Sequence, residues 1–521
     1  MLRERAAGVL LHPTSFPTRY GIGDLGGEAY RFLDWLAQAG QRYWQVLPLN
    51  PTDIGESPYQ SPSAFAGNPV LICLDELVSL GLLNNDELDE AAVPDGETRD
   101  RVPFDEVMPR KMAALEAATR RFLALPDDDG LKIEYEEFCH AEVDWLENHA
   151  LFLALRDANG GKVWTEWTEF VTESKVPIQD AREQLAESLT SHRFLQFLFF
   201  KQWRALKAYA GKLGIAIIGD LPIYVSHNSA DVWANRALFQ LDAAGHSTHV
   251  AGVPPDYFSE TGQLWSNPLY DWDAMARDGY RWWVERLKAC LELVDLVRLD
   301  HFRGFEAYWS VPSGEPTAIN GEWIPGPGSA FLKTLAEAFC GKNEQGEVDV
   351  AGLPIIAEDL GLITAPVDAL RHEFLLPGMK VLHFVLPGEP EDNADPKTFD
   401  ENTVVYTGTH DNDTTIGWFE SDLAQQPDRL ERMRRLTPCN PQGIAWEFIH
   451  LAWHSSSRVA VAPLQDILSL PSSTRMNTPG TFGAEAGNWR WKYQPHVLTA
   501  ELAQRLKELT SASGRLPAAT M

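Results

Sequence analysis

The sequence predicts an α/β protein whose core is a (β/α)8 barrel, or TIM barrel, and three observations support this fold class. Short apolar segments rich in β-branched residues recur eight times along the 521 residues. Segments of helical periodicity separate them, for example residues 28–39 and 280–291. The apolar runs are continuous rather than alternating, which is typical of parallel strands buried on both faces. Eight strand–helix repeats of this kind are the pattern of a closed barrel.

The expected strands, in chain order, span residues 7–13, 43–51, 214–224, 294–301, 354–361, 380–386, 404–413 and 459–466. A barrel core needs about 250 residues, so the remainder is expected to form insertions within a single catalytic unit of residues 1–521. A mainly helical insertion subdomain is expected after the second strand, at about 70–200, and an aromatic-rich loop insertion after the third, at about 226–290. No separate C-terminal β-domain is expected. The last stretch, residues 510–521, is rich in Ser, Ala and Pro and is expected to fray.

Charge, cysteine content and hydropathy exclude several classes of protein. Lys and Arg number 44 and Asp and Glu number 74, which gives a formal net charge of −30. This excess repels phosphate backbones and anionic lipid, so we expect no nucleic acid and no membrane as a partner, and a neutral substrate fits best. The five cysteines form no CxxC pair, which indicates free thiols in a reducing compartment. The apolar runs are too short for a signal peptide or a membrane helix, so we expect a cytoplasmic protein.

A glycine-rich motif at residues 21–26 satisfies the GxGxxG pattern of dinucleotide sites, but its context does not fit one. In that fold the glycines follow a strand directly, and an acidic residue for the ribose lies about 20 residues later. Here a Pro-containing loop, residues 12–20, separates the strand from the glycines, and residues 45–50 contain no Asp or Glu. Asp411 and Asp413 alone are too few ligands to indicate a metal site. We therefore expect neither a nucleotide cofactor nor a metal.

Acidic residues at the ends of otherwise apolar strands are the main functional signal. Asp220 closes the third expected strand, Asp300 the fourth, Glu358 the fifth and Asp411 the seventh. A charge next to a buried run is costly unless it is paired or functional. Around a closed barrel the carboxyl ends of the strands converge on one pocket, so these side chains are expected to meet. The alternative is that they cap the following helices, as Asp commonly does, and for Asp220 alone both interpretations stay open.

Two carboxyl groups in different protonation states are what glycosyl transfer with retention of configuration requires. One carboxylate attacks the anomeric carbon, and the other, with a raised pKa, protonates the leaving oxygen and later deprotonates the acceptor. Arg298 lies two residues before Asp300, so it is expected on the same inward face, where a guanidinium favours an ionised carboxylate. The apolar residues 355–357 before Glu358 favour its neutral acid form. Asp300 therefore fits the nucleophile and Glu358 the general acid and base.

Aromatic and amide side chains supply a second signal. The chain has 18 tryptophans, and residues 251–272 are its densest aromatic stretch within polar sequence. Flat aromatic faces with a polar edge suit the C–H faces of sugar rings, and Gln263 and Asn267 are candidates to bind hydroxyl groups. We expect Trp265 to contact a ligand and Trp272 to cover the barrel core. Polar side chains without a cluster of charge indicate a neutral, polyhydroxylated ligand.

Motifs along nearly the full length resemble those of one family. They include RLDHFRG at 298–304, AEDLG at 357–361 and TGTHDND at 407–413. Further similar stretches are residues 8–17, 20–26, 57–63, 219–225, 251–272, 475–480 and 488–491. In this order they resemble the amylomaltases, the 4-α-glucanotransferases or disproportionating enzymes of glycoside hydrolase family 77.

The resemblance implies roles that agree with those argued from the residues. It implies that Asp300 is the nucleophile, Glu358 the acid and base, and Asp411 a third acid that binds and distorts the donor sugar. It also implies substrate contacts at seven positions, namely Tyr59, Asp220, Gln263, Trp265, Arg298, His301 and His410. Neither a metal nor an organic cofactor is implied. Two departures stand out, since His383 replaces an expected Gln and Lys492 an expected Arg, and both are expected to affect only distal subsites.

The resemblance favours an enzyme that moves part of a 1,4-α-glucan or maltooligosaccharide donor to glucose or to another oligosaccharide acceptor. A retaining α-glucan hydrolase with the same three acids is the main alternative, because the difference lies in how well the acceptor site excludes water. A non-catalytic glucan-binding barrel is a lesser alternative, since binding alone needs no nucleophile beside an acid of raised pKa. The sequence leaves the oligomeric state open.

Overall fold

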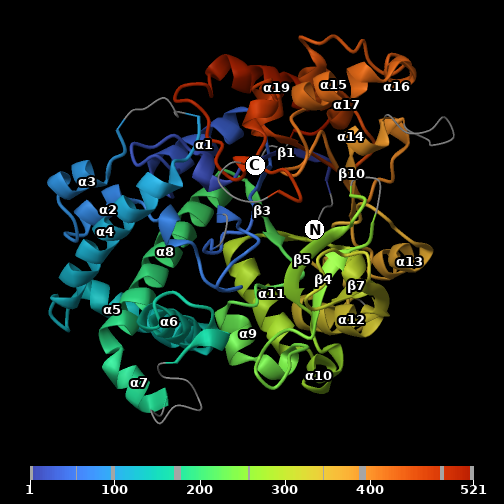
Figure 1. Ribbon diagram of the computed structural model, residues 1–521. Helices are drawn as coiled ribbons and strands as arrows, with labels where there is room; N and C mark the ends of the chain where they lie inside the picture. The colour runs from blue at the N-terminus through green and yellow to red at the C-terminus, as the bar shows by residue number, and fades with distance from the viewer. Residues whose placement is uncertain are drawn as a thin grey trace.

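A barrel of eight parallel strands forms the centre of the computed structural model (Figure 1), which describes residues 4–516 except 54–55, 95–99, 169–177, 256–258, 344, 387–394 and 482–485. Around the barrel the strands follow the order β10-β11-β12-β1-β2-β3-β6-β9. Their bounds are β1 (Ala6–Leu10), β2 (Tyr43–Gln45), β3 (Ala216–Leu221), β6 (Leu296–Leu299), β9 (Ile355–Ala357), β10 (Gly378–Val381), β11 (Thr403–Tyr406) and β12 (Val459–Pro463). Each lies within or next to an expected strand, so the predicted fold class is confirmed.

The alternation of side chains along each strand separates two layers of core. The inward cluster includes Leu10, Ile218, Leu296, Ile356 and Val461. Their sequence neighbours pack outward under the helices, among them Val9, Ile217, Val297, Ile355 and Ala460. Both faces of every strand are thus buried, which explains the continuous apolar runs. The amide of Ala357 donates to the carbonyl of Pro377 at 2.9 Å and so links β9 to the chain just before β10.

The sixth expected strand, residues 380–386, is only partly a strand. The chain leaves the sheet after Val381 and forms the short helix α14 (Leu382–Val385). A short apolar run does not distinguish a strand from a buried helical turn, which is why the sequence predicted one continuous element here.

Helices cover the outside of the barrel and follow the strands as the sequence predicted. Those that border the barrel are α1 (Gly27–Gln38), α11 (Arg281–Leu293), α12 (Gly328–Phe339), α13 (Ala365–Glu373), α15 (Thr415–Ser421), α16 (Pro427–Met433), α17 (Ile444–Trp453), α18 (Leu464–Ile467) and α19 (Ala500–Ala512). Two shorter ones lie between β3 and β6, namely α9 (Ala230–Ala234) and α10 (Trp272–Arg277).

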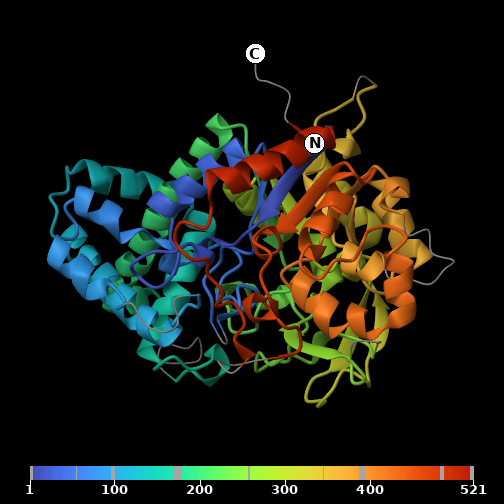
Figure 2. The same cartoon turned by 90° about the horizontal axis from the view of Figure 1, so that it is seen from above.

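Between β2 and β3 the chain forms a helical lobe beside the barrel, the blue-to-teal helices of Figure 2. The lobe consists of α2 (Leu74–Ser79), α3 (Asn85–Ala91), α4 (Phe104–Leu123), α5 (Gly130–Ala141), α6 (Val143–Ala158), α7 (Ile178–Gln184) and α8 (Ala186–Lys212). The long helix α8 joins the lobe to the barrel. The indole of Trp203 donates to the carbonyl of Leu293 at 2.7 Å and its ring lies 5.9 Å from that of Trp44.

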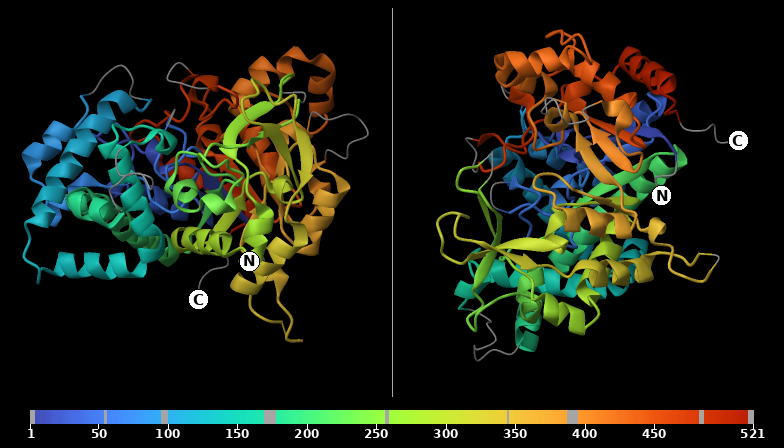
Figure 3. Two further views of the ribbon diagram at one scale, coloured as in Figure 1. Left: turned by 60° about the horizontal axis from the view of Figure 1, so that its bottom comes forward. Right: turned by 90° about the vertical axis from the view of Figure 1, so that its right-hand side faces the viewer.

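A second, antiparallel sheet lies beside the barrel, and the sequence did not predict it. Its order is β5 (Gln263–Pro268), β4 (His249–Val253), β7 (Ala307–Pro312) and β8 (Glu322–Pro325). Figure 3 shows these yellow-green strands as a curved sheet apart from the barrel strands. The expected loop insertion at about 226–290 therefore contains strands, whereas its residues 256–258 lie outside the described chain. β5 is polar, ends in Pro and has a positive φ of 63° at Ser266, so it lacks the signature of a strand.

The C-terminal stretch is anchored rather than frayed as far as residue 516, which corrects the prediction for residues 510–516. The side chain of Thr510 is buried and accepts hydrogen bonds from Trp453 and Gln41. Arg515 is fully buried, and its guanidinium donates to main-chain carbonyls of Ala6, Trp453, Ser455, Ser457 and Arg458. Composition alone predicted mobility here, but one long polar side chain satisfies several strand and helix ends.

Replacement of Arg515 by Met is expected to lower the free energy of unfolding by about 3 kcal/mol, because buried carbonyls lose their donors. The measurement is thermal or urea unfolding followed by tryptophan fluorescence. Arg281→Met is the matched control, since Arg281 is 72% exposed and forms an ion pair with Glu285 on the surface of α11. Equal loss of stability in the two variants would contradict the anchoring role.

Membrane-spanning helices and clusters of metal ligands are both absent from the described residues. No described helix is long and apolar enough to cross a membrane. Within the same residues, no three or more His, Cys, Asp or Glu side chains form a group that could hold a metal ion.

Candidate active site

Register between neighbouring barrel strands brings four of the predicted residues to one edge. Asp220 pairs with Arg298 in the β3–β6 ladder, and Leu299 pairs with Ala357 in the β6–β9 ladder. Asp300 and Glu358 are the next residues on β6 and β9, so they leave the sheet side by side. Their amides donate to Leu221 and Leu299 at 3.0 and 3.1 Å. Arg298 and Asp300 both point into the barrel, as predicted.

Arg298 links two carboxylates inside the barrel mouth. Its Nη1 lies 2.9 and 2.7 Å from the two carboxylate oxygens of Asp220, and its Nη2 lies 2.8 Å from Oδ1 of Asp300. Arg298 and Asp220 are buried, whereas the Asp300 side chain is 26% exposed. Burial raises the pKa of Asp220 to about 6, although the guanidinium opposes this shift. Asp300 therefore carries a charge-assisted hydrogen bond and still faces solvent, as a nucleophile must.

Glu358 is held by the main chain on both sides of its carboxyl group. Oε2 accepts from the amide of His301 at 2.8 Å, and Oε1 accepts from the amide of Leu360 at 2.9 Å. Burial raises the pKa of Glu358 to about 7; the charge of Arg298 lowers it, and the charge of Asp300 raises it further. A carboxyl group with this pKa can donate a proton and take it back near neutral pH.

Tyr59 and His410 connect Asp220 to Asp411. The Tyr59 hydroxyl lies 2.8 Å from Oδ2 of Asp220 and 2.8 Å from Nε2 of His410. A phenol has one hydrogen, so when it donates to Asp220 it accepts from a protonated Nε2 of His410. The two rings stack with 5.4 Å between centroids, and His410 Nε2 lies 3.4 Å from Oδ2 of Asp411.

Asp411 is the most exposed of the three acids and is held by residues whose roles the sequence did not reveal. Its side chain is 42% exposed. Asn477 donates to its Oδ1 at 2.7 Å, and Arg475 donates to its main-chain carbonyl. Trp489 packs against both Tyr59 and His410. The only signal for these contacts was the motif likeness at 475–480 and 488–491.

Gln263 and Trp265 lie on β5, at the side of the site formed by His301. The ring of Trp265 meets that of His301 edge to face at 4.8 Å, and its indole donates to Gln263 at 3.2 Å. Asn267 differs, because it is buried and donates to the carbonyl of Val225 at 2.9 Å. It therefore supports the fold and is not a free ligand for hydroxyl groups. Trp272 packs among core aromatics, as predicted: Tyr270, Trp283, Phe305 and Phe331.

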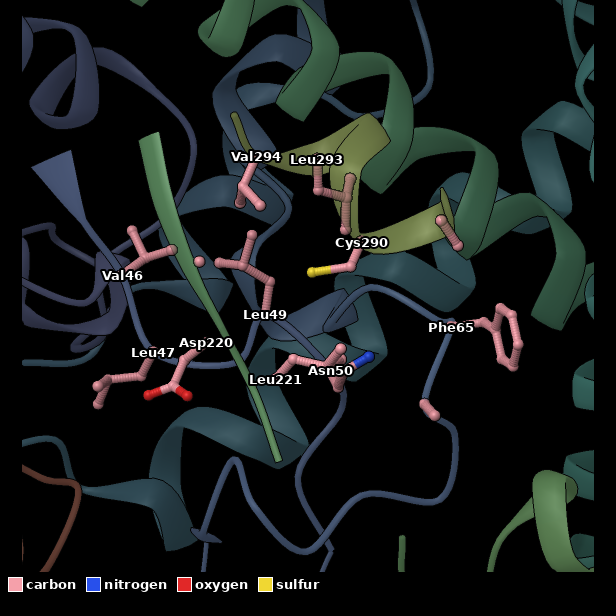
Figure 4. A pocket seen from close by; sticks show the side chains of 13 residues that line it. Val46, Leu47, Leu49, Asn50, Phe65, Asp220, Leu221, Cys290, Leu293 and Val294 are labelled. Carbon is pink, nitrogen blue, oxygen red and sulfur yellow. The ribbon is translucent and has the colours of Figure 1, made fainter. Parts of the chain in front are cut away.

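A small hollow lies beside β3. It measures about 20 Å³ and is lined mainly by apolar side chains, with Asn50 and Asp220 as its polar members (Figure 4). A cavity of this size holds about one water molecule. A Cβ built on Gly219 would lie 2.8 Å from Val294, so no larger side chain fits there. The hollow is too small for a sugar ring, whereas the Asp300 and Asp411 side chains at the mouth of the barrel are 26% and 42% exposed.

The glycine motif at 21–26 packs the first βα loop. A Cβ on Gly23 would come within 1.9 Å of the Pro13 carbonyl, and one on Gly26 within 2.4 Å of the Cys73 sulfur. Other segments of the same chain approach Gly23 and Gly26 so closely that only glycine fits at these positions. The motif is therefore explained by packing, without a bound nucleotide.

The mouth of the barrel holds a carboxylate bound to Arg298 beside a half-buried acid of raised pKa, together with a third carboxylate and aromatic side chains. That set suits transfer of a glycosyl group with retention. Comparisons with known proteins agree. A family model described as 4-alpha-glucanotransferase, glycoside hydrolase family 77, matches residues 11–499.

Individual relatives match over the whole chain. A 4-alpha-glucanotransferase from Synechocystis sp. is 47% identical over 518 residues and is covered to 99%, as is this chain. One from Thermus thermophilus is 46% identical over 520 residues, which are 98% of this chain and 99% of that protein. The structure of an amylomaltase from Streptococcus agalactiae in complex with acarbose has a TM-score of 0.89 at 36% identity, covering 99% of this chain and 100% of that one. The chain therefore belongs to the 4-alpha-glucanotransferase family, glycoside hydrolase family 77.

Proposed function

We propose that Asp300, Glu358 and Asp411 carry out the reaction of this 4-alpha-glucanotransferase. In that reaction a segment of a 1,4-α-glucan or maltooligosaccharide moves to the 4-hydroxyl of an acceptor glucan or of glucose. The observation that carries the assignment is the arrangement at the ends of β6 and β9, where a carboxylate bound to Arg298 stands beside a half-buried acid held by two amides.

The transfer takes place in two displacements. In the first, the Asp300 carboxylate bonds to the anomeric carbon, the glycosidic bond breaks and Glu358 gives its proton to the leaving 4-oxygen. In the second, the acceptor 4-hydroxyl attacks the same carbon, Glu358 takes its proton and the ester to Asp300 breaks. Two inversions give net retention. Atoms and protons balance with these two side chains, so no step of the proposal requires a metal or an organic cofactor.

The surrounding residues are proposed to bind the substrate. Asp411 meets hydroxyl groups of the donor sugar and favours its distorted form, because it is exposed while His410 and Asn477 fix its position. The remaining contacts are assigned to Tyr59, Asp220, Gln263, Trp265, Arg298, His301 and His410. The amylomaltase from Streptococcus agalactiae, a similar structure, contains acarbose.

We further propose that the reaction takes place in the cytoplasm and that residues 1–521 act as one catalytic unit, with the lobe at about 70–200 and the segment at about 226–290 as insertions. All five cysteines are free, which suits a reducing compartment. The contact of Trp203 with Leu293 supports the close attachment of the lobe.

Incubation of the purified protein with maltotriose is expected to give glucose together with a ladder of longer maltooligosaccharides, separated by chromatography. Lengthening is decisive, because hydrolysis only shortens chains. Shorter products alone would identify a retaining α-glucan hydrolase. Sugar binding without any product would identify a glucan-binding barrel.

A further inference from the structure

The Asp466 carboxylate ties together both ends of the loop that carries Asp411. We name residues 407–415 the Asp411 loop; it follows β11 and ends at the first residue of α15. Asp466 lies on α18 and is 1% exposed. Its Oδ2 accepts from the hydroxyls of Thr407 at 2.6 Å and Thr415 at 2.8 Å, and its Oδ1 accepts from the Thr415 amide at 2.7 Å.

A fourth side chain completes this network, and it is one of the two departures from the family pattern. His383 Nε2 lies 3.0 Å from the hydroxyl oxygen of Thr415. That hydroxyl gives its one hydrogen to Asp466, so it accepts from a protonated Nε2 of His383. The imidazole stacks on Trp418 at 4.6 Å, and burial lowers the pKa of His383 to about 3, so the ring is neutral. The sequence placed any effect of His383 at distal subsites, whereas this contact connects it to the Asp411 loop.

Burial of a carboxylate without a counterion costs free energy, so it is an unfavourable way to pack two segments of the chain. Within the described chain, no Lys, Arg or His forms an ion pair with Asp466, and no cation offsets the burial that raises the pKa of its carboxyl group. Apolar side chains of similar size would pack at lower cost, whereas a carboxylate fixes the hydroxyl groups around it in direction as well as distance. The three hydrogen bonds go to the two ends of one loop, so the property they determine is the position of that loop.

We propose that Asp466 is a positioning residue that acts with Thr407, Thr415 and His383 to fix the Asp411 loop, and with it the Asp411 carboxylate. The inference rests on the proposed role of Asp411 in binding the distorted donor sugar. A loosened loop still binds the undistorted sugar through other contacts but loses interactions made in the transition state. Such a change lowers kcat more than it raises KM.

Matched substitutions of the two threonines test this role. Thr407→Val and Thr415→Val keep the shape of the side chain but remove the hydroxyl, whereas Thr407→Ser and Thr415→Ser keep the hydroxyl. Each Val variant is expected to lower kcat on maltotriose about tenfold with KM changed less than about twofold, which is a loss of about 1.4 kcal/mol in the transition state. The Ser variants are expected to stay within about twofold of the wild type. Thr334→Val is the control, since the Thr334 hydroxyl donates to the Ala330 carbonyl on the exposed face of α12.

Substitutions of His383 test the donor that faces Thr415. His383→Gln retains an N–H donor and is expected to keep the wild-type kcat, whereas His383→Leu removes the donor and is expected to lower kcat like Thr415→Val. In the double variant, His383→Leu is expected to lower kcat little further than Thr415→Val alone, because both substitutions remove the same contact.

The outcomes separate this inference from the proposed function. If the wild type transfers glucan but the Val variants keep kcat within about twofold, the positioning role is wrong and the function stands. If the Val variants lower only the melting temperature, or if Ser does not rescue, the network serves stability alone and the inference also fails. If the wild type itself gives no longer oligosaccharides, the proposed function fails.

Discussion

Asp300→Asn is expected to lower the rate of maltotriose disproportionation by at least about 10⁴-fold, while the protein still folds and binds the oligosaccharide. The amide is not a nucleophile, so the glycosyl ester cannot form. The fold should survive because Arg298 keeps its contacts with Asp220 and is not left as an unpaired buried charge. Product formation is measured by chromatography, binding by calorimetry and folding by thermal unfolding.

Asp128→Asn is the matched control, since Asp128 lies in the exposed turn before α5. It is expected to leave the rate unchanged. Near-normal activity of Asp300→Asn would contradict the nucleophile assignment. Loss of sugar binding together with activity would instead assign Asp300 to the binding site only.

The stereochemistry of a small substitute nucleophile tests the same assignment in another way. Asp300→Ala, given an α-maltotriosyl fluoride and azide, is expected to release the β-glycosyl azide. Without the enzyme's nucleophile, azide occupies the space of the carboxylate and displaces fluoride in one inversion. Formation of the α-azide by this variant would show that another side chain still forms the covalent intermediate.

The period of two along each strand made the barrel interior predictable. Once the strand containing Val297 and Leu299 is recognised as buried, Arg298 and Asp300 must both point inward, and register places Glu358 beside them. The alternation of side chains along a strand is local in sequence and steric in origin. A short pattern of side chains therefore sufficed for the fold class and for the residues that meet at the barrel mouth.

Hydrogen bonds between side chains far apart in sequence leave no such pattern. Asn477 binds Asp411 across 66 positions, and Arg515 reaches the carbonyl of Ala6 across 509. Nothing near Asn477 or Arg515 in the chain identifies these partners, because the contact depends on the completed barrel. The same holds for Asp466 and Thr407, whose bond joins α18 to the Asp411 loop only after β11 and β12 pair.

The antiparallel sheet escaped prediction for a different reason. Its strand β5 is polar and interrupted at Ser266, and β7, which pairs with β4, follows only after β6 of the barrel. Pairing with β4, rather than local propensity, makes β5 a strand. The sheet matters for the site because it carries Gln263 and Trp265 to His301, which a flexible loop would not hold in place.

Glu358→Ala is expected to lower disproportionation of maltotriose about 10³-fold, because the leaving sugar oxygen is no longer protonated and the acceptor is no longer deprotonated. The wild type needs Glu358 protonated for the first step. Its pKa of about 7 therefore predicts that kcat/KM on maltotriose falls as pH rises above about 7, as the acid form is lost. This alkaline limb should disappear in the variant.

Donors that differ in leaving group separate the acid from the nucleophile. Fluoride leaves without a proton, so Glu358→Ala given α-maltotriosyl fluoride is expected to form the glycosyl ester on Asp300 at a rate near that of the wild type. The ester then accumulates and is detected by mass spectrometry, because no base activates the acceptor. Azide needs no base and should release the α-azide by a second inversion, opposite in configuration to the product of Asp300→Ala. If Glu358→Ala lost the same factor in rate with maltotriose and with the fluoride, Glu358 would not be the acid that protonates the leaving oxygen.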